Sequence, residues 1–238
     1  MKEEEIRPQK IFDEYLRLAQ IDTNTYFKSE SCFDIKCPAC GAHGEFEFKK
    51  NGFKYESCPE CSTLYVSPRP SSEDFNRYYI EAPSVEYWAT TFYKATEKDR
   101  RKKLWKPKAK LIQEKIKKFG KKSSSIVDIG GGYGIFAEEM GLLTEGLVTV
   151  IEPSPKLANR CKEREISVVE KFLEDVDKRD LPDGAKIFVS FELFEHLHDS
   201  EQFLIDLSTL MQSDDLFIFT TLSGSGVDIQ ALWEDSKS

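Results

Sequence analysis

The 238-residue sequence has no apolar run approaching the roughly 18 residues needed to cross a bilayer. Residues 1–5 are mostly charged and lack the apolar stretch of a secretion signal. We therefore expect a cytoplasmic protein with no membrane partner. Apolar residues make up 39% of the chain and charged residues 32%, which is typical of a soluble globular protein and argues against wholesale disorder.

The net charge of −8 is unevenly distributed. Between Lys98 and Lys122 there are 13 basic and two acidic residues, which leaves 21 basic and 40 acidic residues elsewhere. A predominantly acidic chain is a poor general binder of nucleic acid, so we expect no nucleic-acid partner. We interpret the basic stretch as the solvated face of a lysine-rich helix, with an anion-attracting surface near an acidic substrate as the alternative.

Four of the six cysteines form two C-P-x-C pairs separated by 17 residues: Cys37, Cys40, Cys58 and Cys61. Without a secretion signal, this spacing predicts a structural Zn²⁺ site rather than disulfides. Each pair can supply two thiolates to one tetrahedral metal. Alternating segments flank Asn51-Gly52, a strong hairpin signal between the pairs. We interpret the segment as a zinc ribbon, with two unrelated redox pairs as the alternative.

The segments on either side of the cysteines read as helical. Apolar spacing predicts an amphipathic helix over residues 6–21, followed by a polar connector over 22–31. Ser71 or Ser72 is a candidate N-cap for a helix through Tyr79. An aromatic stripe over residues 87–93 indicates either core packing or a cap over the following domain, and Pro107 is expected to start a new helix.

The most informative stretch, from Ile126 to Phe136, reads as a buried strand, a tight turn and a helix. The turn contains four glycines: Gly130, Gly131, Gly132 and Gly134. Glycine is expected where a turn needs positive φ, or where a ligand approaches the backbone closely. A dinucleotide fingerprint fits only in a late register, at Gly132-x-Gly134-x-x-Ala137. NAD-dependent oxidoreduction is therefore one alternative.

The register that starts at Asp128, Asp128-x-Gly130-x-Gly132-x-Gly134, resembles the first motif of class I S-adenosyl-L-methionine (SAM)-dependent methyltransferases. The resemblance implies a glycine backbone packed against the methionine part of the cofactor.

From Ser125 onward, strand and helix patterns alternate, which predicts an α/β fold with a Rossmann-like parallel sheet. The expected later strands lie at residues 147–151, 166–169, 185–190 and 216–221. The expected helices between them include residues 155–164 and 201–211.

Further cofactor-binding candidates follow these strands. Glu152 ends the second strand and is followed by Pro153, and a carboxylate there can accept hydrogen bonds from both ribose hydroxyls. After the third strand, Phe172 and Leu173 are candidates for the adenine contact, although a core role explains them equally well. Phe191, at the end of the fourth strand, completes the predicted set.

Glu195-His196 follows the fourth strand and matches the Glu-His element of ubiquinone-pathway O-methyltransferases and sugar methyltransferases. The resemblance implies a catalytic role, since a carboxylate beside histidine can raise its basicity. In the ubiquinone-pathway enzymes the related motif is a divalent metal site. Mg²⁺ at Glu192, Glu195 and His196 is therefore a less favoured alternative, and solvated polar residues in a turn are another.

Together, these motifs resemble bacterial sugar or polysaccharide-type proteins with a CPxC…CPxC zinc ribbon before a class I methyltransferase domain. We divide the chain into an N-terminal helical arm (1–31), the zinc ribbon (32–70), a helical linker or cap (71–122) and a SAM-binding domain (123–238). The resemblance implies SAM, structural Zn²⁺ and a small-molecule acceptor, with an anionic sugar precursor among the candidates.

The sequence departs from that family after the fifth strand, because the remaining residues are too few for the usual last hairpin. A non-catalytic zinc-ribbon interaction protein is thus a further alternative, and the oligomeric state is not predicted.

Overall fold

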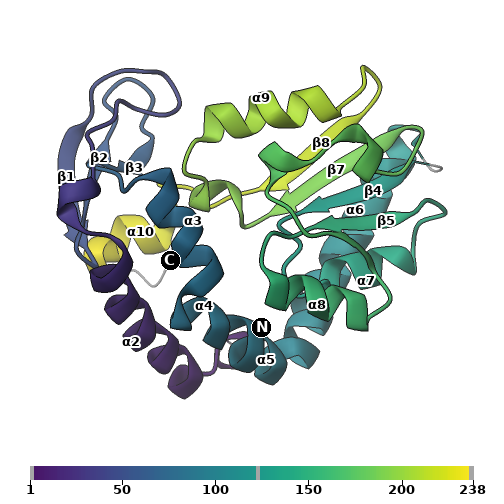
Figure 1. The fold of residues 1–238 in the computed structure, drawn as a ribbon, viewed down its shortest axis with the longest axis horizontal. Helices are drawn as coiled ribbons and strands as arrows, with labels where there is room; N and C mark the ends of the chain where they lie inside the picture. The colour runs from purple at the N-terminus through teal and green to yellow at the C-terminus, as the bar shows by residue number, and fades with distance from the viewer. Residues whose placement is uncertain (1–2, 122–123, 236–238) are drawn as a thin grey trace.

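The computed structural model describes residues 3–121 and 124–235. The outermost residues of the predicted arm and SAM-binding domain, and residues 122–123, lie outside these ranges. Figure 1 shows a small sheet and a larger sheet at opposite sides of the molecule, with a chain of helices connecting them. The two sheets correspond to the predicted ribbon and the predicted parallel sheet.

The N-terminal segment forms α1 (Glu3–Ile6) and the long helix α2 (Gln9–Tyr26). The predicted helix is confirmed, but the predicted connector is wrong at its start because α2 continues five residues past Ile21. Asp22, only 2% exposed, explains the extension. Its carboxylate accepts a 2.7 Å hydrogen bond from the Ser84 N–H, so a residue that suggested a loop instead satisfies a buried donor.

The ribbon is a three-stranded antiparallel sheet of β1 (Glu45–Lys50), β2 (Phe53–Ser57) and β3 (Leu64–Val66). The predicted hairpin is confirmed, because Asn51 and Gly52, with φ of 53° and 89°, connect β1 to β2. Positive φ at both positions matches the twist of the flanking strands. An isolated bridge between Phe33 and Arg69 joins the two ends of the segment.

The linker is helical almost throughout. The helix α3 (Ser72–Glu81) begins as predicted, since the Ser71 hydroxyl accepts a hydrogen bond from the Asp74 N–H at 3.1 Å. The remaining elements form one helical run: α4 (Pro83–Tyr87), η2 (Trp88–Phe92), α5 (Tyr93–Arg100), η3 (Arg101–Trp105) and α6 (Lys106–Lys118). Both η2 and η3 are π-helical turns.

The position of Pro107 agrees with the prediction, because α6 begins one residue before it. The helical run nevertheless continues through this point from α5, so Pro107 does not begin a separate rod.

The larger sheet has five parallel strands in the order β6-β5-β4-β7-β8, which confirms the predicted α/β fold. The strands are β4 (Ser125–Ile129), β5 (Val148–Ile151), β6 (Ser167–Val169), β7 (Lys186–Phe191) and β8 (Leu216–Thr220). Each lies within one residue of its predicted bounds. The two central strands, β4 and β7, are buried along their whole length.

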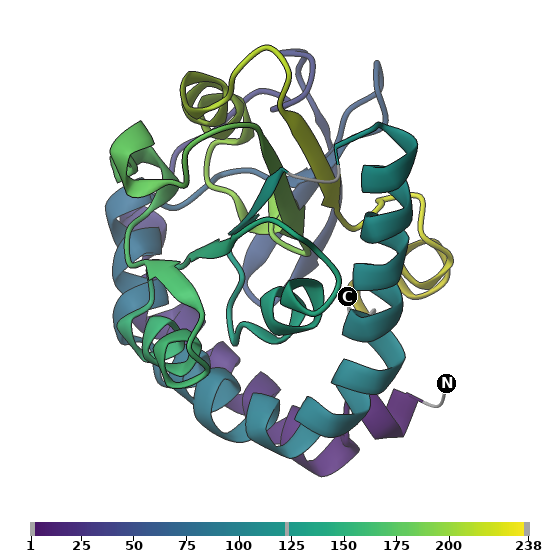
Figure 2. The ribbon, with the colours of Figure 1, turned by 90° about the vertical axis from the view of Figure 1, so that its right-hand side faces the viewer.

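Helices cover both faces of this sheet (Figure 2). On one face lie α6, α7 (Ile135–Gly141) and α8 (Pro155–Glu163), through the apolar clusters that they share with the strands. The helix α9 (Ser200–Leu210) covers the other face together with η4 (Leu173–Asp175). The strand order reverses at β4, and ligands of open α/β sheets bind beyond the carboxyl ends of the strands at such a point.

The segment after β8 leaves the parallel sheet and returns to the ribbon. It forms α10 (Val227–Leu232) and η7 (Trp233–Asp235), which lie beside the ribbon in Figure 1. The Trp233 ring contacts the Phe48 ring with 5.8 Å between centroids. The C-terminal segment therefore packs on an element more than 160 residues away in the sequence, which the sequence analysis did not predict.

The remaining short helices are η1 (Ser29–Ser31), η5 (Lys178–Asp180) and η6 (Phe194–His196). Across residues 3–121 and 124–235, none of the helices has the length and apolar character needed to cross a membrane.

Candidate active site and metal centre

The glycine turn connects β4 to α7 and can be built only from residues without a side chain. Gly134 has φ of 75° and caps the N-terminus of α7. A Cβ on Gly134 would lie 3.0 Å from both the Cys161 Sγ and the Ile166 Cδ1. A Cβ on Gly131 would lie 2.7 Å from the Asp128 Oδ2. The turn therefore places backbone close to the end of β4, as expected for a loop that cradles a ligand.

Two buried carboxylates meet this turn from adjacent strands. Asp128, in β4, is 2% exposed, and Glu152, directly after β5, is 5% exposed. The Glu152 carboxylate accepts hydrogen bonds from the N–H groups of Gly132 and Ser154, both at 2.9 Å. The Asp128 Oδ2 is buried and has no partner among the described residues. The Asp128 carboxylate is thus incompletely satisfied by the chain itself.

The electrostatics of this acidic pair favour a ligand that carries donors or positive charge. Burial raises the pKa of Asp128 to about 8, and the nearby Glu152 carboxylate contributes to that rise. Burial also raises the pKa of Glu152 to about 7, against the opposing effect of its two backbone donors. Two ionised carboxylates in a desolvated site are costly, and ammonium or hydroxyl groups of a ligand would reduce that cost.

The other predicted cofactor residues lie close in the fold but differ in exposure. Leu173 is buried in an apolar cluster, and Phe172 and Pro153 keep part of their surface. Phe191 is buried, and its ring contacts the Phe136 ring with 4.7 Å between centroids. The structure thus places Leu173 and Phe191 in the core, and their proposed contact with a cofactor stays a prediction.

The turn after β7 carries the predicted catalytic residues. His196 ends η6; its imidazole is accessible to solvent although protein surrounds it on most sides. This desolvation lowers the pKa of His196, and the charges of Glu195 and Glu192 oppose the effect. A neutral imidazole near neutral pH can accept a proton. Glu195 Oε2 accepts a 3.0 Å hydrogen bond from the Thr221 hydroxyl, which holds it beside the end of β8.

The carboxylate of Glu192 contacts Thr220 and Lys108. Its Oε1 accepts a 2.8 Å hydrogen bond from the Thr220 hydroxyl and lies 3.4 Å from the Lys108 Nζ. Among the described residues, only the four cysteines bring three or more metal-ligating atoms close together. The structure does not bring Glu192, Glu195 and His196 together in that way.

Residues of the linker also lie near the turn, and the sequence analysis did not assign them to the site. The Tyr93 ring stacks on the Tyr133 ring at 5.2 Å, and the Tyr93 Oη lies 3.6 Å from the Cβ position of Gly132. Burial raises the pKa of the Tyr79 hydroxyl, with smaller contributions from nearby groups that include Glu195 and Glu152. The aromatic stripe was the available signal for Tyr93, but spacing alone could not separate a cap from a core.

A second histidine has a structural position. The Nε2 of His198 lies 2.8 Å from the Pro70 carbonyl oxygen, and its ring packs on Phe33 and Phe75. Arg69 donates a hydrogen bond to the His198 carbonyl oxygen. His198 therefore joins the ribbon to the turn after β7, two residues beyond the predicted catalytic histidine.

The four cysteines form a compact cluster at one end of the ribbon. Two Sγ–Sγ distances, from Cys37 to Cys61 and from Cys40 to Cys58, are both 3.5 Å. All four Sγ atoms lie within 4.8 Å of one another. These distances exceed the roughly 2 Å of a disulfide and approach the about 3.8 Å separation of thiolates around one tetrahedral zinc. The donor set and its spacing fit a closed structural zinc site.

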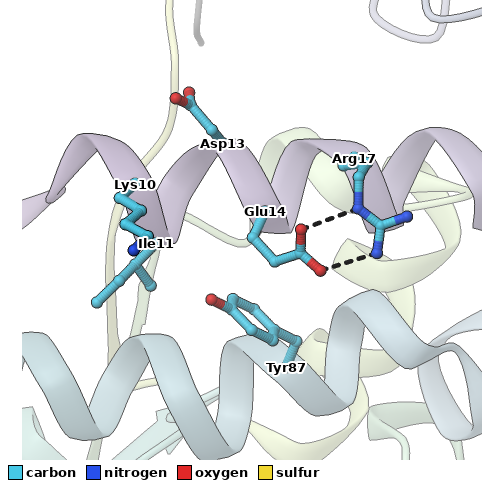
Figure 3. Close-up of a pocket in the computed structure, with 6 residues that line it drawn as sticks. All are labelled: Lys10, Ile11, Asp13, Glu14, Arg17 and Tyr87. Atoms are coloured by element: carbon cyan, nitrogen blue, oxygen red, sulfur yellow. Dashed lines mark hydrogen bonds and ion pairs between the residues drawn. The ribbon is translucent and has the colours of Figure 1, made fainter.

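A surface hollow of about 670 Å³ lies between α2 and α4, and none of its lining residues belongs to the glycine turn or the cysteine cluster. Its lining residues are Lys10, Ile11, Asp13, Glu14, Arg17 and Tyr87. Figure 3 shows that Glu14 and Arg17 pair with each other across two hydrogen bonds, each 2.8 Å long. Two of its charged groups thus neutralise each other, and the hollow contains neither the glycine turn nor the acidic pair.

Comparison with known proteins identifies the family of the larger domain. A family described as "Methyltransferase domain" matches residues 98–236. No match was found among curated proteins. Among solved structures, the plantazolicin methyltransferase BpumL in complex with S-adenosylhomocysteine (SAH) is similar, with a TM-score of 0.53 and 13% identity. That likeness covers 69% of this chain and 62% of BpumL.

A second similar structure is the sugar N-methyltransferase KedS8 from Streptoalloteichus sp. ATCC 53650, with a TM-score of 0.46 and 13% identity. It covers 56% of this chain and 55% of KedS8. The chain thus spans less than two thirds of the length of both proteins. At these identities, the likeness to BpumL shows the fold alone.

Proposed function

The chain belongs to the methyltransferase-domain family, and from this premise we propose that it transfers a methyl group from SAM to a small-molecule acceptor. One observation carries the proposal: the buried Asp128 and Glu152 carboxylates end adjacent strands at a glycine turn, and Asp128 Oδ2 has no partner in the described ranges. A ligand with an ammonium group and a ribose supplies the donors that such a site needs.

The residues fit the cofactor in the following roles. The glycine turn and Asp128 would hold the methionine part, and Glu152 would accept hydrogen bonds from the ribose hydroxyls. Phe172 and Pro153, which keep part of their surface, are the available apolar contacts for the adenine. When bound, SAM supplies an electrophilic methyl group on a sulfonium, so the protein contributes positioning and one base.

We assign the base to His196. Its lowered pKa keeps the imidazole neutral, so a ring nitrogen can take the proton from the attacking oxygen, nitrogen or carbon of the acceptor. The negative charges of Glu195 and Glu192 stabilise the imidazolium that results. Replacing His196 with glutamine should lower turnover about 100-fold or more and leave SAH binding unchanged.

We further propose that Cys37, Cys40, Cys58 and Cys61 hold a structural Zn²⁺ and that the acceptor is a sugar or a nucleotide-linked sugar precursor. The Sγ spacing supports the metal. The resemblance of the Glu195-His196 element to sugar methyltransferases supports the acceptor class. Product analysis with nucleotide sugars, after incubation with SAM, tests that class.

Isothermal titration with SAH tests the cofactor site directly. The wild-type protein, loaded with zinc, should bind SAH, and Glu152→Gln should weaken binding about 10- to 100-fold by removing a charged acceptor. Glu145→Gln is the matched control, because Glu145 is exposed on the same domain. Absence of SAH binding to the wild type, or equal affinities for the two variants, would contradict the proposal. Binding without turnover on any acceptor would favour the non-catalytic alternative.

A further inference from the structure

Two consecutive arginines at the end of α5 have different surroundings. Arg101 forms ion pairs of 2.5–2.9 Å with three carboxylates: Glu97, Glu138 and Glu139. Arg100 forms no ion pair with any residue that the structure describes. Arg101 thus ties the linker to α7, whereas the charge of Arg100 is left without a carboxylate partner.

The Arg100 side chain is nevertheless partly desolvated, with intermediate exposure for the residue as a whole. Its carbon lies 5.7 Å from the Phe92 ring centroid and 5.5 Å from the Tyr93 centroid, so two rings flank it. Its Nε is buried without a hydrogen-bond partner in the described chain. Desolvation lowers the pKa of Arg100, and the positive charge of Arg7 adds to that effect. The two ring faces stabilise the cation and the Tyr93 hydroxyl accepts a hydrogen bond from the guanidinium, but the Nε donor is left unsatisfied.

The position of Arg100 points to the methyltransferase centre. Tyr93, on which the guanidinium rests, approaches Gly132 in the glycine turn. The charge of Glu192, in the turn that carries His196, also acts on Arg100. The π-helical turn η3 begins at the next residue, and such turns occur frequently at functional sites. Arg100 is therefore linked to the glycine turn through Tyr93 and to the turn after β7 through the charge of Glu192.

The described chain contains three buried side-chain atoms without a hydrogen-bond partner: Arg100 Nε, Trp105 Nε1 and Asp128 Oδ2. The two donors lie at opposite ends of η3, since Arg100 is its N-cap and Trp105 its last residue. The acceptor, on Asp128, lies at the glycine turn. Trp105 packs near Phe191 with 6.5 Å between ring centroids, so it also neighbours the end of β7. Unsatisfied groups thus gather around one region of the fold, which favours a binding role over chance.

We propose that Arg100 recognises an anionic group, a carboxylate or a phosphate, on a small molecule bound in the methyltransferase centre. This inference rests on the proposed function. Two molecules could supply the group: the cofactor through its amino-acid carboxylate, and the acceptor through an acidic group. The planar fork of an arginine matches both oxygens of a carboxylate or phosphate, and the two rings hold that fork in place.

The stability of the free protein separates this role from a structural one. A partly buried cation without a carboxylate partner adds little stability to the fold, so Arg100→Met should leave the melting temperature unchanged or raise it. Arg101→Met should lower the melting temperature, because it leaves the buried Glu139 carboxylate without its cation and leaves Glu97 and Glu138 with Arg164 alone. A fall for Arg100→Met as large as that for Arg101→Met would overturn the proposal.

Binding measurements then identify the source of the anion. SAH, 5′-deoxy-5′-methylthioadenosine and inorganic phosphate are titrated into zinc-loaded wild type, Arg100→Met, Arg100→Lys and Arg179→Met. Methylthioadenosine lacks the amino-acid part of SAH, and phosphate is added to protein saturated with SAH. Arg179, whose side chain is 89% exposed, provides the control for loss of one positive charge.

If Arg100 binds the cofactor, Arg100→Met weakens SAH binding about 10- to 100-fold and leaves methylthioadenosine binding unchanged. If it binds the acceptor, SAH affinity is unchanged, and phosphate binding to the SAH-loaded wild type is lost in Arg100→Met. In either case Arg100→Lys should recover only part of the affinity, because lysine lacks the fork. Wild-type affinities for SAH and phosphate in Arg100→Met would overturn this inference, whereas a wild type that binds no SAH would contradict the proposed function instead.

Discussion

The ribbon and the parallel sheet acquire their stability in different ways. The apolar cluster of the ribbon consists of Cys37, Cys58 and Tyr65, with Ile35 and Ala42 beside it, so two of its three buried members are proposed metal ligands. The central strands of the parallel sheet are buried on both faces. Two larger apolar clusters join the sheet to α6 and α7 on one face and to α9 and η4 on the other. A small sheet that lacks an apolar core needs a metal, whereas a five-stranded sheet between helix layers does not.

The comparison predicts its largest effect for loss of the metal site. Cys58→Ser removes a ligand that is 1% exposed, and the ribbon should then unfold while the parallel sheet stays folded. Zinc binding contributes about 10–16 kcal/mol in isolated zinc-finger peptides. The small apolar cluster of the ribbon cannot replace a contribution of that size. Hydrogen exchange should rise in peptides that cover residues 45–66 and stay low in residues 125–129. Cys32→Ser, outside the cluster, is the control, and equal protection in both variants would refute the comparison.

A backbone change in the other region should have the next largest effect. Gly134→Ala forces a side chain into positive φ and against the Cys161 Sγ, which should destabilise the protein by about 1–3 kcal/mol. SAH binding should fall as well, because the turn cannot keep its geometry. Gly141→Ala, at the end of α7 with open space around it, should leave stability unchanged or raise it. Denaturant unfolding monitored by circular dichroism measures both.

The acidic pair predicts opposite pH trends for stability and for binding. Asp128 and Glu152 have pKa values raised to about 8 and about 7, so the folded protein retains protons that the unfolded chain has lost. The stability from these groups is complete below a pH of about 4 and is lost as pH rises toward 8, by at most about 1.4 kcal/mol per pH unit for each carboxyl. The ribbon has no comparable buried pair among its described residues.

SAH binding should strengthen over the same interval, because its donors favour the ionised carboxylates. Titrations at pH 6 and pH 8 in buffers of different ionisation enthalpy measure the affinity and the protons released. Asp128→Asn should flatten the dependence. An SAH affinity that is independent of pH in the wild type would show that the pair is not part of the site.

The smallest effect concerns the contact between the two regions. Trp233→Ala removes a ring that is 37% exposed and touches Phe48, so we expect a loss of stability below about 1 kcal/mol. The ribbon should nevertheless release zinc faster to a chelating dye, because the C-terminal segment no longer covers β1. Leu232→Ala, in the neighbouring turn, is the control. Equal release rates would mean that the ribbon is stable independently of this contact.

Local signals in the sequence predicted each element accurately where they were strong. The positive-φ pair at Asn51-Gly52, the cap at Ser71 and the alternation from Ser125 onward all match the structure. Asp22 shows where such signals fail, because a polar residue can continue a helix when a distant N–H needs its carboxylate. The partner of Asp22 lies 62 residues away and cannot be found by local pattern.

The candidate site shows the same division. The motif residues Asp128 and Glu152 lie close together, because they stand at the same end of two adjacent parallel strands. The roles assigned to the predicted site residues stay predictions. Sequence alone left Arg100 ambiguous between core and cap and favoured a solvated turn for His198, because their neighbours come from the glycine turn, the ribbon and the turn after β7.

The sequence by itself determined the two sheets, the cysteine cluster and the acidic glycine turn, since turn chemistry, strand periodicity and the spacing of the cysteines act over a few residues. Only the tertiary structure decided which charges are paired. It satisfied Arg101 with three carboxylates, left Arg100 between two rings, and returned the C-terminal segment to the ribbon. Desolvation and ion pairing depend on atoms brought together from distant parts of the chain, and no local pattern encodes them.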